Sequence, residues 1–173
     1  PVAALVRRVD VRRSTKMLRE LCTMTTIIEE LAEFAATTSL ADLPDVVLTE
    51  AKRVLLDSLG CGLAGHVHPK GSIGVELGAL LGGSSTEATV VGIDRRLSIL
   101  GAAVANGELI NALDFDAILP PGHVSPYVIP GALALAEVNH IGGAEFLAAI
   151  AVAHEISYRF GKSMDWTRDT EEG

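Results

Sequence analysis

Two aspartates and a histidine stand close together in this sequence, and their types suit acid–base chemistry. Asp114 and Asp116 flank a phenylalanine, and His123 follows after a segment rich in proline and glycine. Removing a proton next to a carboxylate requires a base that titrates near neutral pH and a fixed partner that orients it. A histidine paired with an aspartate provides both, so these residues are candidates for a proton-transfer site. In the alternative structural interpretation, the aspartates cap a helix and the histidine fills a turn.

The sequence after His123 bears on what this site could bind. Ser125 is predicted to cap the start of a helix, with Pro126 as the next residue. Main-chain N–H groups and the helix dipole at such a start favour an anionic substrate. A metal ion held by Asp114, Asp116 and His123 is a further alternative, but we predict no metal here.

Three other motifs fit structural roles better than chemical ones. Residues 60–65 match the G-x-G-x-x-G pattern of dinucleotide-binding proteins, but a helical pattern precedes them and the acidic residue expected about 20 positions later is missing. We expect these glycines to end a helix. His66 and His68 have no third metal ligand at a recognisable spacing, which favours an exposed loop. His154 lacks the second histidine of a zinc protease, because Tyr158 occupies that place.

Helical periodicity and helix start signals run through most of the chain after Met24. Thr26 and Glu29 form a capping box, and apolar residues recur every three or four positions in the segments that follow. The predicted helices span residues 26–36, 44–59, 72–81, 97–113, 125–139 and 143–160. Residues 89–91 form either a short strand or an extended connector. The pattern predicts an all-α fold, a multi-helix bundle in which the helix at 97–113 is buried on most sides.

The composition excludes several classes of protein. Of the 173 residues, 49% are hydrophobic and 21% are charged, so the chain is too apolar to be disordered. A net charge of −8 and only one Trp, two Tyr and four Phe argue against a nucleic-acid partner. No apolar stretch is long enough to span a membrane, so no membrane partner is expected. Two cysteines cannot build a disulfide framework, which favours a reducing compartment and a cytoplasmic location.

The charge is unevenly distributed along the chain, and with the helical pattern it divides the sequence into three segments. Residues 1–24 contain six basic and two acidic residues, whereas acidic residues predominate afterwards. We expect residues 1–23 to be an extension upstream of a natural start at Met24. The alternative is a basic leader of the transit-peptide kind, which would place the protein in mitochondria. Residues 24–162 form the predicted helical domain, and residues 163–173 form a polar tail without a pattern.

Several segments resemble the MmgE/PrpD family, which includes 2-methylcitrate dehydratase, cis-aconitate decarboxylase and iminodisuccinate epimerase. The similar segments are residues 51–61, 88–92, 105–107, 113–116, 123, 130–137 and 154–159. The chain departs from the family pattern at Ala117, Ile118 and Val124, and Asn111 stands where a histidine is common. The resemblance covers residues 25–162 and implies the family's N-terminal helical domain. The family's later histidine motif, catalytic lysines and lid domain have no counterpart after Arg159, so we expect the lid domain to be absent.

The resemblance also implies an activity and its residues. It indicates a lyase or isomerase that needs no cofactor and acts on a small di- or tricarboxylate, with dehydration of a 2-methylcitrate-like substrate favoured. His123 is the implied general acid or base and Asp114 its orienting partner, while Asp116 and Asn106 are weaker candidates for binding the substrate. A homodimer formed through the helical domain is expected. The alternative is a non-catalytic, truncated family member that serves as a helical dimerisation module.

Overall fold

The computed structural model describes residues 25–120 and 122–164, in two units that meet between Thr37 and Thr38. The predicted leader at residues 1–23 and the tail from residue 165 lie outside the described residues. The first unit contributes α2 (Ile27–Thr37), which begins at the predicted capping box. The main-chain N and Oγ1 of Thr26 donate to Glu29 Oε2 over 2.8 and 2.9 Å, and Glu29 N donates to Thr26 Oγ1 over 3.2 Å. The predicted start of this helix is therefore confirmed.

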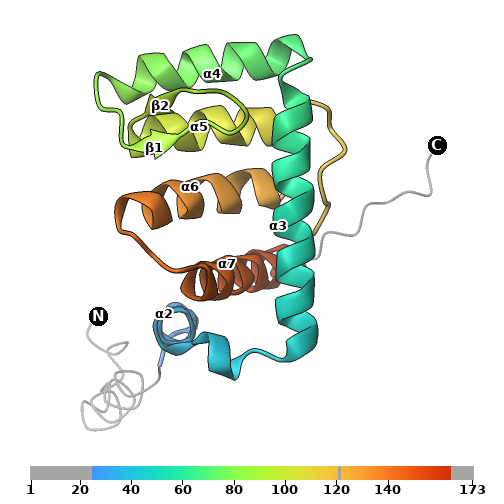
Figure 1. Cartoon of the computed structure of the whole chain (residues 1–173). Coiled ribbons are helices and arrows are strands. Elements are labelled where there is room, and N and C mark those ends of the chain that lie inside the picture. Colours follow the sequence, from blue (N-terminus) through green and yellow to red (C-terminus); the bar gives the residue numbers. More distant parts are fainter. Residues whose placement is uncertain (1–24, 121, 165–173) are drawn as a thin grey trace, which may run out of the picture. The chain divides into compact units, whose positions relative to one another are not determined.

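The second unit is a helical bundle in which one long helix crosses the others. Its helices are the short 3-10 helix η2 (Leu40–Asp42), α3 (Asp45–Gly65), α4 (Pro69–Gly82), α5 (Ile99–Ile110), α6 (Ser125–Val138) and α7 (Gly143–Ser163). Figure 1 shows α4, α5, α6 and α7 one after another along α3, and α3 packs against α5, α6 and α7. The described residues form six α-helices and one two-stranded sheet, so the all-α prediction is confirmed.

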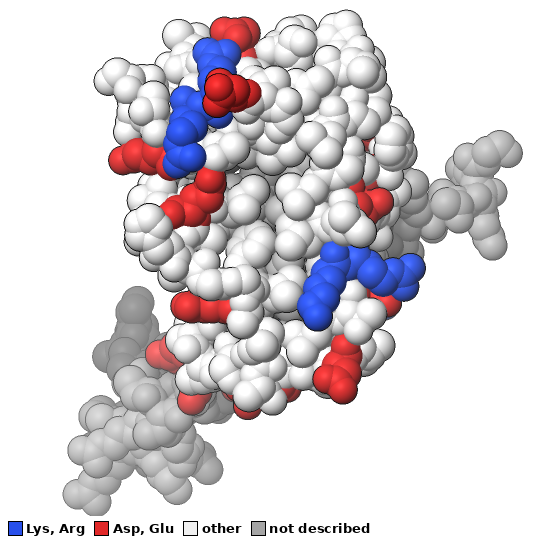
Figure 2. All heavy atoms as spheres, viewed as in Figure 1, with Lys and Arg blue, Asp and Glu red and all other residues white. Residues whose placement is uncertain are grey.

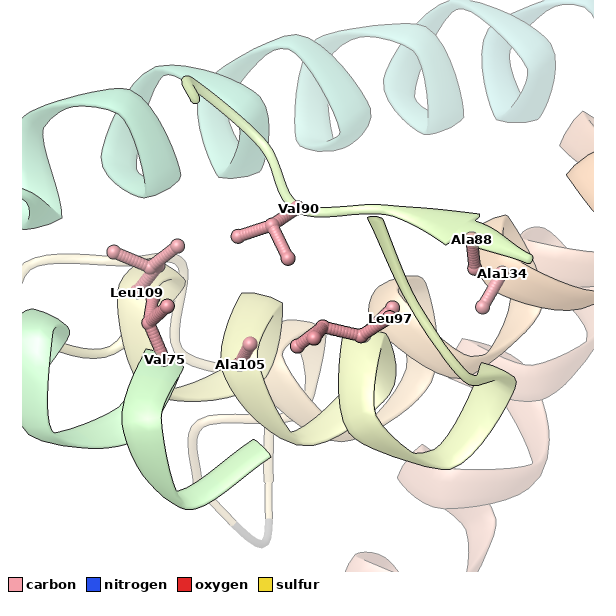
Figure 3. Packing of buried hydrophobic residues seen from close by; sticks show 8 residues of the cluster. Val75, Ala88, Val90, Leu97, Ala105, Leu109 and Ala134 are labelled. Carbon is pink, nitrogen blue, oxygen red and sulfur yellow. The ribbon is translucent and has the colours of Figure 1, made fainter. Parts of the chain in front are cut away.

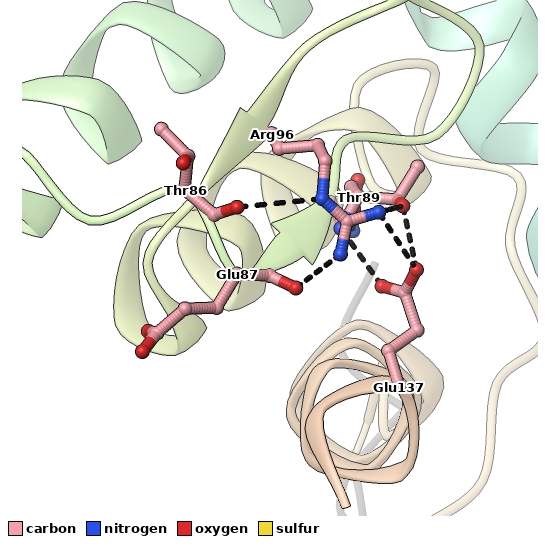
Figure 4. A network of polar contacts seen from close by, with 6 residues as sticks. Thr86, Glu87, Thr89, Arg96 and Glu137 are labelled. Atoms are coloured by element: carbon pink, nitrogen blue, oxygen red, sulfur yellow. Dashed lines mark hydrogen bonds and ion pairs between the residues drawn. The ribbon is translucent and has the colours of Figure 1, made fainter. Parts of the chain in front are cut away.

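A small hairpin lies beside α5 and is fastened to the end of α6. Strands β1 (Ala88–Thr89) and β2 (Arg96–Leu97) pair antiparallel, which places the predicted strand one residue earlier and makes it shorter than residues 89–91. Glu137 of α6 accepts hydrogen bonds from Thr89 N over 2.7 Å and from Thr89 Oγ1 over 2.6 Å. The Arg96 guanidinium lies 3.7 Å from the same carboxylate, as Figure 4 shows. The hairpin is thus held by charge-assisted hydrogen bonds.

Two groups of buried apolar residues form the core of the second unit. The first fills the space between α4, α5, the hairpin and α6 (Figure 3), and consists of Val75, Ala88, Val90, Leu97, Ala102, Ala105, Leu109 and Ala134. The second joins α3, α6 and α7 and consists of Ala51, Ile129, Phe146 and Ile150. Four of the eight residues in the first group are alanines, and a Cβ at Gly78 of α4 would overlap the carbonyl oxygen of Gly101 in α5. Helices α4 and α5 therefore pack closely and leave little room for added side-chain volume.

Helix α3 does not end where the sequence predicts. We expect the glycines at 60, 62 and 65 to end it, but the helix runs through them to Gly65. The physical reason is helix packing, because a Cβ at Gly65 would lie only 2.9 Å from the carbonyl carbon of Leu109 in α5. Gly65 therefore permits a close approach between α3 and α5, whereas a Cβ at Gly60 would meet nothing within 4 Å. Likewise α4 begins at Pro69, three residues before the prediction, because His68 caps it by accepting from Lys70 N over 3.2 Å.

The surface of the second unit combines few charges with exposed apolar side chains. On the face shown in Figure 2, Lys and Arg side chains form two small groups, each beside acidic side chains, and most of the remaining surface is uncharged. Ile73, Leu77 and Leu80 recur along α4 and are 68%, 43% and 80% exposed. None of the helices in the described part of the chain combines the length and apolar character needed to cross a membrane. A homodimer would cover such apolar surface, and it stays a prediction.

Candidate functional site

The chain turns sharply after α5, and this turn presents the first aspartate. Helix α5 ends at Ile110, three residues before the predicted end, and Asn111 caps it. Asp114 N donates to the carbonyl of Asn111 over 3.2 Å, and Asp114 has a φ of 58°. Most residues with a Cβ avoid this left-handed region, but aspartate tolerates it. The helix therefore stops early because a turn ending in a left-handed aspartate replaces its last predicted residues.

A closed loop then returns the chain to His123. The main chains of Leu119 and Gly122 bond each other in both directions, over 2.8 Å from Leu119 N and 2.6 Å from Gly122 N. The described residues of this loop form no helix, in agreement with the prediction from its proline and glycine content. Val124 follows with a relative exposure of 3% and anchors the start of α6. His123 is thereby fixed between a closed loop and a buried residue.

His123 lies between the two aspartates, one of which is buried and the other exposed. Its Nδ1 is 3.1 Å from Asp116 Oδ2, and its Nε2 is 3.4 Å from Asp114 Oδ1. The side chain of Asp116 is 0% exposed and that of Asp114 is 81% exposed, while His123 keeps 28% of its side chain exposed. One edge of the imidazole ring therefore faces the protein interior, and the other edge is open to solvent.

The structure thus brings together three of the four predicted site residues, but the two aspartates occupy different positions around His123 from those that the sequence predicts. The sequence predicts Asp114 as the partner that orients His123 and Asp116 as a group that binds substrate. In the structure, the buried and closer carboxylate is that of Asp116, which makes a hydrogen bond with Nδ1. Asp114 lies on the exposed side of the ring, at a distance that is long for a hydrogen bond.

Asp116 has further partners that the sequence did not identify as part of the site. Asn111 Nδ2 donates to Asp116 Oδ1 over 3.0 Å, so each carboxylate oxygen has a partner. Lys70 Nζ in turn donates to Asn111 Oδ1 and, over 3.3 Å, to the main-chain carbonyl of Asn111. Lys70 also lies 3.6 Å from Glu108. Lys70 comes from the start of α4, 41 residues away in sequence, and no local motif marks it.

Asn106, the fourth predicted residue, supports the hairpin instead of facing His123. It is 2% exposed, its Oδ1 accepts from Val91 N over 2.8 Å, and its Nδ2 donates to Thr89 O over 2.9 Å. Both polar atoms of its amide are therefore bonded to the main chain of β1 and of the residues just after it. This arrangement satisfies a buried polar side chain and joins α5 to the hairpin. Its role in substrate binding stays a prediction.

The pKa values of two other groups are shifted in the direction that favours their neutral forms. Burial raises the pKa of the Cys61 thiol, and the carboxylates of Asp57 and Asp116 raise it further. Burial lowers the pKa of His154, although its hydrogen bond to the Ile150 carbonyl opposes this effect. The carbonyl accepts from His154 Nδ1 over 2.7 Å, which leaves Nε2 to accept from Ser125 Oγ at 3.3 Å. This contact joins the first turn of α6 to α7.

The remaining histidine motif has structural contacts. His66 Nε2 lies 2.7 Å from the carbonyl of Val91, and His68 caps α4. Across residues 25–120 and 122–164, no three His, Cys, Asp or Glu side chains are grouped so that they could hold a metal ion.

Comparison with known proteins identifies relatives of this chain. The MmgE/PrpD N-terminal domain matches residues 29–171. The cis-aconitate decarboxylase-like protein oryM of Aspergillus oryzae is 30% identical over 149 residues, covering 80% of this chain and 30% of that protein. The cis-aconitate decarboxylase of Mus musculus is 31% identical over 75% of this chain and 27% of its own length. The human cis-aconitate decarboxylase is 34% identical over 68% of this chain and 25% of its own length.

These relatives are much longer than the part of them that this chain matches. The matched regions amount to 30% or less of each of these relatives, so the chain spans less than a third of their length. No solved structure matches it. Cis-aconitate decarboxylases are lyases, so the resemblance is to a family of enzymes. The match of residues 29–171 to the family's N-terminal domain, together with these relatives, shows that this chain belongs to the MmgE/PrpD family.

Proposed function

We propose that this chain carries the proton-transfer part of the active site of an MmgE/PrpD-type lyase that acts on a small di- or tricarboxylate. The observation that carries the proposal is the position of His123. One ring nitrogen is held by a buried carboxylate, and the other lies on the open side of a side chain that is 28% exposed. A general acid or base needs both a fixed orientation and access to a substrate, and this histidine has both.

In a decarboxylation, a general acid is needed to donate a proton to the substrate. When carbon dioxide leaves, the electron pair of the broken carbon–carbon bond stays on the substrate and a proton must be added to carbon. Protonated His123 donates that proton from Nε2 and becomes neutral. The carboxylate of Asp116 accepts from Nδ1 throughout and stabilises the ring while it carries charge.

The named relatives favour decarboxylation over the dehydration that the sequence favours. All three are named as cis-aconitate decarboxylases or as similar to one, and none is named as a dehydratase. In a dehydration, the same histidine would act first as a base that removes a proton next to a carboxylate. We therefore propose cis-aconitate, a tricarboxylate, as the first substrate to test and 2-methylcitrate as the second.

The test measures turnover of cis-aconitate by the complete gene product that contains these 173 residues. His123→Gln is expected to lower turnover about 10²-fold or more, the usual contribution of a general acid or base, with an unchanged melting temperature. His140→Asn is the matched control. His140 is exposed and has a φ of 54°, which asparagine also tolerates, so this variant is expected to keep full activity.

Two outcomes would contradict the proposal. A His123→Gln enzyme that is less stable but fully active would show that the histidine only fills a turn. A folded protein that turns over neither cis-aconitate nor 2-methylcitrate would support the alternative of a non-catalytic helical module. Asp116→Asn and Asp114→Asn separate the two carboxylates, since the buried partner of Nδ1 is expected to matter more than the exposed one.

A further inference from the structure

A chain of polar contacts connects the start of α4 to the buried edge of His123. Lys70 Nζ donates to the side-chain oxygen of Asn111 and, over 3.3 Å, to its main-chain carbonyl. Asn111 Nδ2 donates to Asp116 Oδ1 over 3.0 Å, and Asp116 Oδ2 lies 3.1 Å from His123 Nδ1. Four side chains from two helices and a loop therefore follow one another without a gap.

The chemistry of the first member fixes the direction of every bond in this chain. A lysine ammonium has only donors, so the oxygen of the Asn111 amide must face Lys70. The NH₂ group of the same amide then faces Asp116, and a carboxylate can only accept. Both oxygens of Asp116 are thus acceptors, and the remaining donor must come from His123. The proton on the imidazole ring is therefore drawn to Nδ1.

We propose that Lys70 and Asn111 are positioning residues that hold Asp116 and so select the Nδ1–H tautomer of His123. The inference rests on the proposed function, in which His123 moves a proton at its other nitrogen. A neutral imidazole carries one N–H, and the opposite tautomer would place the Nδ1 lone pair against an oxygen of Asp116. With the proton on Nδ1, Nε2 carries the free lone pair and can accept a proton, which it can donate once the ring is protonated at both nitrogens. Nε2 lies on the side of the exposed Asp114.

A purely structural role for Lys70 is the competing interpretation. Its ammonium also lies 3.6 Å from Glu108, so it could simply join α4 to α5. Its side chain is 39% exposed, and an exposed ion pair of this kind contributes little to stability. The two interpretations differ in one observable, because only a positioning residue changes which nitrogen of His123 carries the proton.

The experiment reads the tautomer directly in the full chain. Histidine labelled at its ring nitrogens gives a long-range nitrogen–proton correlation spectrum that distinguishes Nδ1–H from Nε2–H. The His123 signals are assigned from their loss in His123→Gln, and spectra are recorded at a pH where the ring is neutral. The variants are Asn111→Leu, Lys70→Met and Lys70→Arg, with Lys52→Met on an exposed position of α3 as the matched control.

The expected result is an Nδ1–H tautomer in the original chain. The variants are expected to lower the fraction of this tautomer by different amounts. Asn111→Leu removes a hydrogen bond to a charged group and is expected to change the tautomer ratio about 10-fold towards Nε2–H. Lys70→Met removes only what orients the amide and is expected to change the ratio about two-fold or more. Lys70→Arg keeps a side chain that can only donate, so it should keep the tautomer ratio of the original chain. Lys52→Met should also leave this ratio unchanged.

The inference is overturned if the original chain shows Nε2–H, or if folded Asn111→Leu and Lys70→Met both keep the original ratio. Should Asn111→Leu fail to fold, Lys70→Met decides alone, since its half-exposed site tolerates methionine.

Turnover by the complete gene product separates this inference from the proposed function. Asn111→Leu is expected to lower kcat roughly 10- to 100-fold with little change in KM, because a displaced catalytic group costs about that much. If His123→Gln loses activity and Asn111→Leu does not, the inference fails and the proposed function stands. If the tautomer shifts as expected while His123→Gln stays active, the proposed function fails and the positioning of His123 stands.

Discussion

Gly65 lies so close to α5 that its replacement by alanine is expected to destabilise the fold. A Cβ at this position would be 2.9 Å from the carbonyl carbon of Leu109 and 3.1 Å from its Cα. The obstruction is main chain, so no side-chain rotation can relieve it. Gly60 lies five positions earlier in the same helix, and a Cβ there would meet nothing within 4 Å. The two glycines therefore form a matched pair.

The size of each effect follows from this geometry. The nearest obstruction is the carbonyl oxygen of Leu109, which a Cβ at Gly65 would overlap. Atoms in contact lie about 3.5 Å apart, so α3 and α5 must separate by roughly 1 Å to admit a methyl group. Overpacking of this kind costs typically about 1–3 kcal/mol. Gly60→Ala adds no clash and removes the poor helix propensity of glycine, which gains up to about 1 kcal/mol.

The assay is unfolding by urea and by heat, on both variants and the original chain. Gly65→Ala is expected to lower the melting temperature by roughly 2–12 °C and Gly60→Ala to raise it by roughly 2–4 °C, for a chain of this length. The urea dependence of the unfolding free energy should keep its slope, since neither change alters the surface exposed on unfolding. If both variants are stabilised alike, α3 and α5 do not approach as described, and the packing argument is refuted.

Three further predictions follow from individual contacts. His154 has a pKa in the folded state that is below its usual value, so the unfolded chain binds a proton at this residue more readily. Its contribution to stability is therefore complete above about pH 6.5 and is lost as the pH falls through the lower folded-state pKa. His154→Gln should flatten this acid side of the stability curve, measured by urea unfolding between pH 5 and 7. Glu137→Gln should cost about 1–3 kcal/mol in thermal unfolding, because it weakens charge-assisted bonds to Thr89 and Arg96 that hold the hairpin, and an unchanged melting temperature would contradict this. Light scattering is expected to give twice the chain mass for the predicted homodimer, and a monomer at micromolar concentration would rule it out.

Local signals in the sequence were sufficient to predict most of the helices. The capping box at Thr26 marks the start of α2, because this signal depends only on neighbouring residues. Helix α6 begins at Ser125 as predicted, but Val124 is its N-cap, and Ser125 Oγ contacts His154 Nε2 instead of capping the helix. The end of α3 could not be predicted in the same way. Glycine usually interrupts a helix, and only the presence of α5 against Gly65 shows that it is needed there for packing.

The candidate site shows the same division between local and long-range information. The types and spacing of Asp114, Asp116 and His123 indicated proton transfer, and the structure brings all three together. The sequence specifies neither which aspartate lies buried nor the left-handed φ of Asp114. The role of Lys70 depends on a contact across 41 positions, and no pattern of neighbouring residues predicts such a contact.

The close packing of small residues and the polar chain at His123 are parts of one arrangement. A Cβ at Gly71 would lie 2.9 Å from the carbonyl carbon of Gly65, whose own neighbour is Leu109. Lys70 immediately precedes Gly71, and Asn111 follows Leu109 by two residues, so the contact between three helix ends sets the distance that the lysine must span. A larger residue at Gly71 would push the start of α4 away from α3 and α5, and so move Lys70 away from Asn111. Gly65 and Gly71 therefore bring the start of α4 close to the end of α5, and this places the Lys70 ammonium within reach of the Asn111 amide that contacts Asp116.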